Sequence, residues 1–173
     1  MPHVTAPVSA DASELAVLVR EHLDALCTYA THLVGDSGDA LEFVAAGLHH
    51  ASRYPPTRID ADGRVALYRA VTNACRHGHR FPPRRAGPAR LFRRARPPFS
   101  AEIEADAAER INTVKRALMT LGFERRAALL LRDLIGLSHG DLGRALECSP
   151  NSAARVLAGA RREFGGVYRD IRL

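Results

Sequence analysis

The chain has 173 residues, of which 46% are hydrophobic and 25% charged, and its net charge of +6 suggests a polyanionic partner. It is long enough to bury one sizeable core or two small ones. No apolar run approaches the roughly 18 residues of a membrane-spanning helix, and the N-terminus lacks the pattern of a secretory signal. The three cysteines lie far apart and do not indicate a disulfide framework. We therefore expect a cytoplasmic protein.

The first 80 residues predict three helices that form one small domain at residues 12–80. The expected helices run from residue 11 to Gly35, from residue 36 to the prolines at 55–56, and from residue 60 to about residue 79. Apolar residues recur in each at spacings of three and four, which marks one buried face of a helix. Nothing alternates with a period of two over the length of a strand, so no sheet is expected.

Residues 81–100 interrupt the helical pattern with five prolines, which prevent a stable helix and predict a linker. From Arg76 to Ser100 the chain has eight arginines and no acidic residue, so this segment carries +8 and the rest of the chain −2. Arginine supplies 24 of the 25 basic residues, a bias that genomic base composition alone can produce. The missing acidic residues are not explained in that way, and they favour a local polyanion-binding role.

Residues 101–168 predict a second helical domain with four helices. The first helix carries an apolar stripe that we expect to face the core: Ile103, Ala107, Ile111, Val114, Leu118 and Leu121. The second helix is expected to stop at Gly136, and a brief third one follows. Ser149 and Pro150 open a long last helix that Gly165–Gly166 is expected to end. The last two helices have the spacing of a helix-turn-helix, and the predicted fold class is all-α.

Three stretches carry a family resemblance: YATHLVGDSGDALEFVAAGLHHA and ALYRAVTNACRHGHR in the first domain, and RRAALLLRDLIGLSHGDLGRALECSPNSAARVLAGAR in the second. In order and spacing they resemble the polymerase-binding, promoter-opening and promoter-reading helices of extracytoplasmic function (ECF) sigma factors, members of the sigma-70 family of bacterial RNA polymerase. Alanine stands at residues 45 and 46, where the family usually carries Gln and Glu. Ala154, Val156 and Gly159 stand where it favours Lys and Arg. The chain thus resembles a divergent member.

The resemblance implies core RNA polymerase and promoter DNA as partners, and an anti-sigma protein as a regulator. It places the polymerase contact on the second helix, which contains Glu42, Val44 and Leu48. A membrane is not among the expected partners.

The third helix is expected to contribute one DNA-binding face, because Arg69, Asn73, Arg76 and Arg80 follow one another at steps of four, three and four. Guanidinium and amide groups on one stripe suit phosphates and the edges of exposed bases. The resemblance implies that this face contacts the non-template strand at the minus-ten element. The alternative is a solvated polar face of a packed helix.

The last helix is expected to contribute the second DNA-binding face. Asn151, Ser152 and Arg155 near its N-terminus can bond base edges in the major groove of the minus-thirty-five element. Arg162 faces away from the core stripe, and Arg161 flanks it and would reach a phosphate. The alternative is a helix-turn-helix kept for structure, with weakened DNA contact.

Catalytic, metal and cofactor sites are not predicted. Cys75, His77 and His79 lie two residues apart, whereas zinc ligands on a helix need spacings of three or four to share a face. No phosphate-binding glycine loop and no activated nucleophile can be identified. The expected function is a sigma-like transcription initiation factor, not an enzyme. The alternatives are a sigma-derived regulator or decoy that binds polymerase or promoters weakly, and a protein-interaction module without DNA binding.

Overall fold

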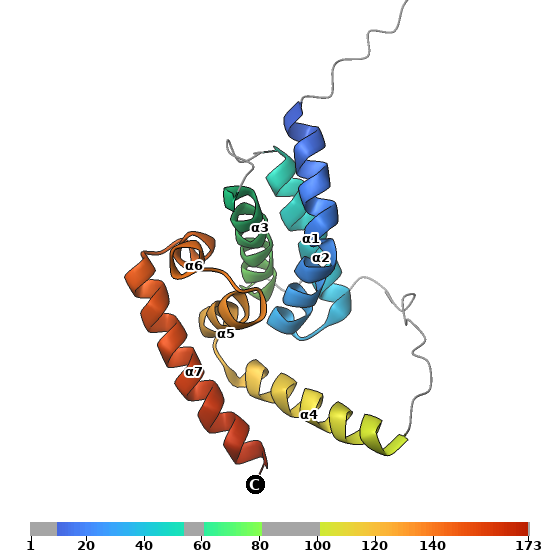
Figure 1. The fold of residues 1–173 in the computed structure, drawn as a ribbon, viewed down its shortest axis with the longest axis vertical. Helices are drawn as coiled ribbons and strands as arrows, with labels where there is room; N and C mark the ends of the chain where they lie inside the picture. Colours follow the sequence, from blue (N-terminus) through green and yellow to red (C-terminus); the bar gives the residue numbers. More distant parts are fainter. Residues whose placement is uncertain (1–9, 54–60, 81–100, 173) are drawn as a thin grey trace, which may run out of the picture.

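The computed structural model describes residues 10–53, 61–80 and 101–172, and side chains over 15–53, 63–78 and 108–172. All regular structure in these ranges is helical, so the all-α class is confirmed (Figure 1). The elements are α1 (Ala10–Val34), α2 (Ser37–Arg53), α3 (Ala61–Arg80), α4 (Ala101–Thr120), α5 (Phe123–Leu129), the π-helical turn η1 (Leu130–Leu134), α6 (His139–Leu146) and α7 (Pro150–Arg172). The predicted linker at residues 81–100 lies outside the described residues. None of the described helices is long and apolar enough to cross a membrane.

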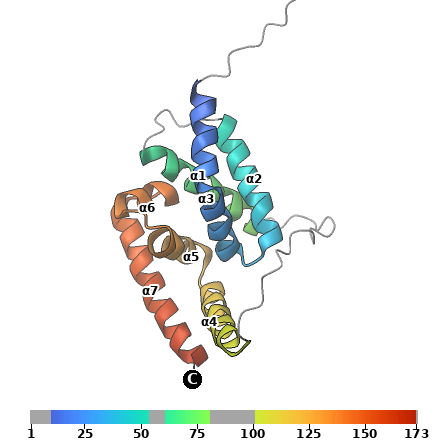
Figure 2. The ribbon, with the colours of Figure 1, turned by 45° about the vertical axis from the view of Figure 1, so that its right-hand side comes forward.

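Helices α1, α2 and α3 form the N-terminal half, a three-helix bundle (Figures 1 and 2). Gly35, with a φ of 86°, turns the chain sharply out of α1, a conformation that glycine adopts without strain. Oδ1 of Asp36 then accepts from the N–H of Gly38 at 2.7 Å and caps α2. The backbones of α2 and α3 approach closely, since a Cβ at Gly47 would lie 2.9 Å from Cα of Val71. The three helices expected in this half are confirmed.

Helices α4 to α7 form the C-terminal half, in which α6 and α7 are joined by a three-residue turn. Ser149 Oγ accepts from the N–H of Ser152 at 3.2 Å, so the predicted cap of α7 is confirmed. Gly143 permits the tight turn, because a Cβ there would lie 2.8 Å from the carbonyl oxygen of Cys148. Leu142 and Leu157 are buried between the two helices. The sequence did not predict η1, which interrupts the single helix expected before Gly136.

The expected end of α7 at Gly165–Gly166 is wrong, because the helix continues to Arg172. Neither glycine has a positive φ. Glycine weakens a helix interior by about 1 kcal/mol relative to alanine but does not break it. The rings of Phe164 and Tyr168 stack across the two glycines at 5.8 Å, and the guanidinium of Arg172 lies over the Tyr168 ring, so side-chain contacts support the last turns.

The expected core stripe of α4 is only partly buried. Leu118 and Leu121 are 5% and 1% exposed, as expected, but Ile111 is 54% and Val114 36% exposed. Figures 1 and 2 show the reason: α4 meets the other helices near its C-terminal end and runs away from them toward its N-terminal end. The prediction that Ile111 and Val114 lie in the core is therefore wrong.

The two halves pack against each other through α1 and α3 on one side and α5, η1 and α6 on the other. Arg126 of α5 is 4% exposed, and its guanidinium donates to the carbonyl oxygen of Leu33 in α1 at 2.6 Å. It also donates to the carbonyl oxygens of Leu118 and Leu121 at 2.9 and 2.8 Å. These carbonyls lie at helix C-termini, where the helix dipole favours a cation. Arg126 therefore joins the ends of α1 and α4 across the seam between the halves.

Candidate nucleic-acid interface

The N-terminal end of α7 presents the polar residues predicted to read DNA. Asn151 and Arg155 are exposed and Ser152 is half-buried. The Arg155 guanidinium lies 3.5 Å from Ser152 Oγ, at the outer limit of a hydrogen bond, so most of its donors remain available. In a helix-turn-helix, these first turns of the second helix are the part that enters the major groove. The three residues are together on one accessible surface.

The two arginines further along α7 differ in their surroundings. Arg161 forms an ion pair with Asp133 of η1, with Nε 3.1 Å from Oδ2. This carboxylate raises the pKa of the Arg161 guanidinium. Arg162 is also exposed, and no acidic partner is recorded for it among the described residues. Both arginines are therefore accessible, but the Arg161 guanidinium is already paired with a carboxylate.

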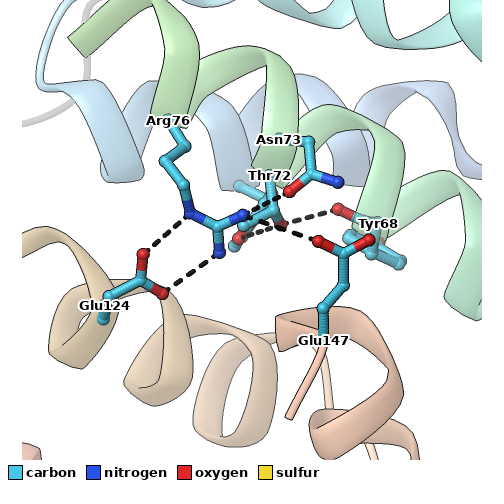
Figure 3. A network of polar contacts seen from close by, with 7 residues as sticks. Tyr68, Thr72, Asn73, Arg76, Glu124 and Glu147 are labelled. Carbon is cyan, nitrogen blue, oxygen red and sulfur yellow. Dashed lines mark hydrogen bonds and ion pairs between the residues drawn. The ribbon is translucent and has the colours of Figure 1, made fainter. Parts of the chain in front are cut away.

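The α3 residues predicted to contact DNA do not form an open face. Arg76 forms a two-pronged ion pair with Glu124 of α5: Nε lies 2.7 Å from Oε1 and Nη2 3.1 Å from Oε2 (Figure 3). It also lies 4.0 Å from Glu147 Oε2, and Nη1 donates to Oδ1 of Asn73. The Glu124 carboxylate raises the pKa of Arg76. Arg69 is exposed, and the Arg80 side chain lies outside the described residues.

Sequence reasoning missed the acidic partners Glu124 and Glu147. Glu147 lies in the helix-turn-helix turn with a φ of 58°, a left-handed conformation uncommon for residues other than glycine. From this turn its carboxylate points toward Arg76 on α3 (Figure 3). The turn of the C-terminal half and the polar face of α3 are therefore direct neighbours. Glu124 is 48 residues from Arg76, and no spacing rule relates the two.

A hollow of about 430 Å³ lies where α2, α3 and the helix-turn-helix turn meet. Gly47 and three alanines line it, together with the polar residues His50, Asn73, Arg76, His77 and Glu147. It therefore carries both basic and acidic groups. The hollow belongs to the same polar network as the Arg76 ion pairs.

The residues predicted to bind polymerase on α2 have unequal access to solvent. Glu42 is exposed and Leu48 half-buried, but Val44 is 3% exposed and packs in the core of the N-terminal half. Leu41 was not predicted, although it is 51% exposed and lies one helical turn from Ala45. Its spacing of three from the buried Val44 gave no signal that Leu41 would be exposed.

The described side chains contain no group of three His, Cys, Asp or Glu residues placed to hold a metal ion. Cys75 is buried, and burial raises the pKa of its thiol to about 12. A thiol with so high a pKa is neither a reactive nucleophile nor a ready metal ligand. His77 is exposed, and the His79 side chain lies outside the described residues.

No protein-family model matches the chain, and no curated protein matches it with significance.

Proposed function

We propose that this protein is a sigma-like transcription initiation factor that binds core RNA polymerase and directs it to promoter DNA. The observation that carries the proposal is the cluster of exposed Asn151 and Arg155 with half-buried Ser152 on the first turns of α7, directly after a tight turn from α6. An amide at this place can pair with adenine and a guanidinium with guanine, each through two hydrogen bonds. Arg162 would add a phosphate contact.

DNA contact by α3 would require Arg76 to exchange its carboxylate partners for phosphates. Glu124 and Glu147 supply two acidic groups where a nucleic-acid backbone would otherwise approach. We therefore take the arrangement with packed halves to be the DNA-free form, and we expect promoter contact by α3 to separate α3 from α5 and α6. The +8 segment from Arg76 to Ser100 would contribute sequence-independent phosphate contacts.

A sigma-derived regulator or decoy is the second candidate. Two ion pairs favour it: Arg76 with Glu124, and Arg161 with Asp133. Both ion pairs compete with phosphate for arginines that would bind DNA. Such a protein would keep the fold and bind promoters weakly.

Run-off transcription with bacterial core RNA polymerase and a library of genomic fragments tests the first proposal. Wild-type protein is expected to produce discrete transcripts, and Arg155→Ala should reduce them, whereas Arg169→Ala, at the far end of α7, should not. Co-purification with core polymerase should be lost in Leu48→Asp and kept in Val17→Asp, which also puts a charge at a position not fully buried. Polymerase binding without any transcript would favour the decoy. If the protein neither binds polymerase nor produces a transcript, both the initiation factor and the decoy are contradicted.

A further inference from the structure

A cavity of about 400 Å³, broadly open to solvent, lies where α1, α4, η1 and α7 meet, and it shares no lining residue with the hollow beside Arg76. Its size falls within the range of roughly 300–1,000 Å³ that small-molecule sites occupy. Its walls are mainly apolar side chains from the C-terminal half: Val114, Leu118, Leu129, Leu130, Leu134 and Phe164. The polar residues at its edge are His32, Asp133 and Arg161.

The π-helical turn η1 shapes one wall of this cavity. The N–H of Ile135 donates to the carbonyl oxygen of Leu130 at 3.0 Å, a bond that spans five residues instead of four. The turn leaves Leu134 48% exposed at the cavity, which Val114, 36% exposed, also lines. Single π-helical turns in helical proteins are frequent at functional sites. Two large apolar side chains are thus held partly open to water at a place where the backbone departs from the regular helix.

His32 is the polar group that distinguishes the cavity from a plain apolar groove. Its Nδ1 is buried and has no hydrogen-bond partner among the described residues. Burial, with the nearby positive charge of Lys115, lowers the pKa of the imidazole and so favours the neutral ring. A neutral imidazole has one donor and one acceptor nitrogen. A ligand hydroxyl group both donates and accepts, so it would pair with His32 Nδ1 in either tautomer. Because Nδ1 is buried, the ring must first turn about the Cβ–Cγ bond to bring this atom to the cavity.

The charges at the edge argue against a charged ligand. Asp133 and Arg161 form an ion pair with each other, so together they add no net charge. Asp133 already accepts from Nε and Nη2 of Arg161, so a carboxylate ligand would compete with Asp133 and a cation with Arg161. An uncharged ligand meets neither competitor.

We propose that this cavity binds a small, uncharged, largely apolar ligand that carries one hydroxyl group, with the apolar body between α4, η1 and α7 and the hydroxyl beside His32. Because His32 belongs to α1 and the other lining residues to the C-terminal half, the ligand contacts both halves. Its binding therefore favours the arrangement in which the halves are packed together. The proposal does not rest on the proposed DNA contacts, although it shares Arg161 with them.

The test uses the uncharged fluorescent probe N-phenyl-1-naphthylamine and the full chain, which contains no tryptophan to interfere. 1-Decanol should displace the probe, and decanoate should do so at least tenfold less effectively. Val114→Phe fills the cavity and should weaken binding of the probe and of decanol at least tenfold. Val17→Phe is the matched control, since Val17 is 52% exposed on α1 and does not line the cavity, and it should leave both unchanged.

Two further variants separate loss of the site from loss of the fold. Leu134→Gln should weaken probe binding with an unchanged circular-dichroism spectrum, because Leu134 is already 48% exposed. His32→Leu should weaken decanol by about 2- to 10-fold, the value of one net hydrogen bond. The proposal is overturned if the probe fails to bind, if it binds the wild type and Val114→Phe equally, or if decanoate displaces it as well as decanol.

Discussion

The first turns of α7 and the polar face of α3 invite comparison, because both were predicted from their residue spacing to contact DNA. Asn151 and Arg155 on α7 are exposed to solvent, whereas Arg76 on α3 forms an ion pair with Glu124 of the other half. The helical period correctly predicts which residues share a face. It carries no information on which distant element covers that face. The acidic residues that cover α3, Glu124 and Glu147, lie 48 or more residues after Arg76 in the chain.

The comparison depends on the packing of the two halves, so the largest expected effect concerns Arg126. Arg126→Met removes a buried guanidinium and leaves carbonyl oxygens at the ends of α1 and α4 without a donor. We expect a loss of about 3 kcal/mol in the free energy of unfolding, since hydrogen bonds to charged groups each contribute roughly 1.5–3 kcal/mol. Urea denaturation measures it. Arg125→Met is the control: this side chain is 53% exposed and forms only a surface ion pair with Glu163, so stability should change by less than about 1 kcal/mol.

The α7 side of the comparison is tested by Arg155→Ala. This change should reduce the free energy of promoter binding by about 1–3 kcal/mol and relax the preference at one base position, as the loss of a bidentate contact does. Binding measured across a set of single-base variants of the promoter gives both quantities. Arg169→Ala removes the same charge from the last turn of the same helix and should have no effect on base preference. An unchanged affinity and preference in Arg155→Ala would make α7 a purely structural helix.

The α3 side is tested by releasing Arg76 from its acidic partners. Glu124→Gln combined with Glu147→Gln should strengthen DNA binding a few-fold, while stability falls by less than about 1 kcal/mol, because both acids are half-exposed. Glu21→Gln with Glu109→Gln changes the net charge equally at exposed positions away from the network. Equal gains in the two double variants would show that net charge, and not the release of Arg76, explains the effect.

The smallest effect concerns the helix that supports the recognition turns. Hydrogen bonds from Ser138 and Arg144 lower the pKa of Asp141 in α6. A carboxyl with a depressed folded-state pKa stabilises the fold above its unfolded pKa of about 3.9 and loses that contribution as the pH falls through the folded value. The free energy of unfolding of wild type should therefore fall slightly more than that of Asp141→Asn below about pH 4. Acid titration followed by circular dichroism measures the difference, and parallel curves would contradict it.

Local chemistry makes several features of the fold predictable from the amino-acid sequence. Gly35 ends α1, and Ser149 and Pro150 open α7, because caps and turns depend on residues within a few positions of one another. The same local rules were wrong at Gly165–Gly166, where stacking of Phe164 on Tyr168 supports the helix across both glycines. They also could not predict η1, since helix-type residues fill α5 and η1 alike.

The sequence by itself determined the all-α fold class, where most of the described helices begin and end, and that a polar surface occupies the start of α7. These properties follow from interactions between residues a few positions apart. Only the tertiary structure decided that Arg76 is paired with Glu124, that Ile111 and Val114 stay exposed, and that His32 lines a cavity built by the other half. Such contacts join residues far apart in the chain, and their partners depend on how whole helices pack, which no local pattern records.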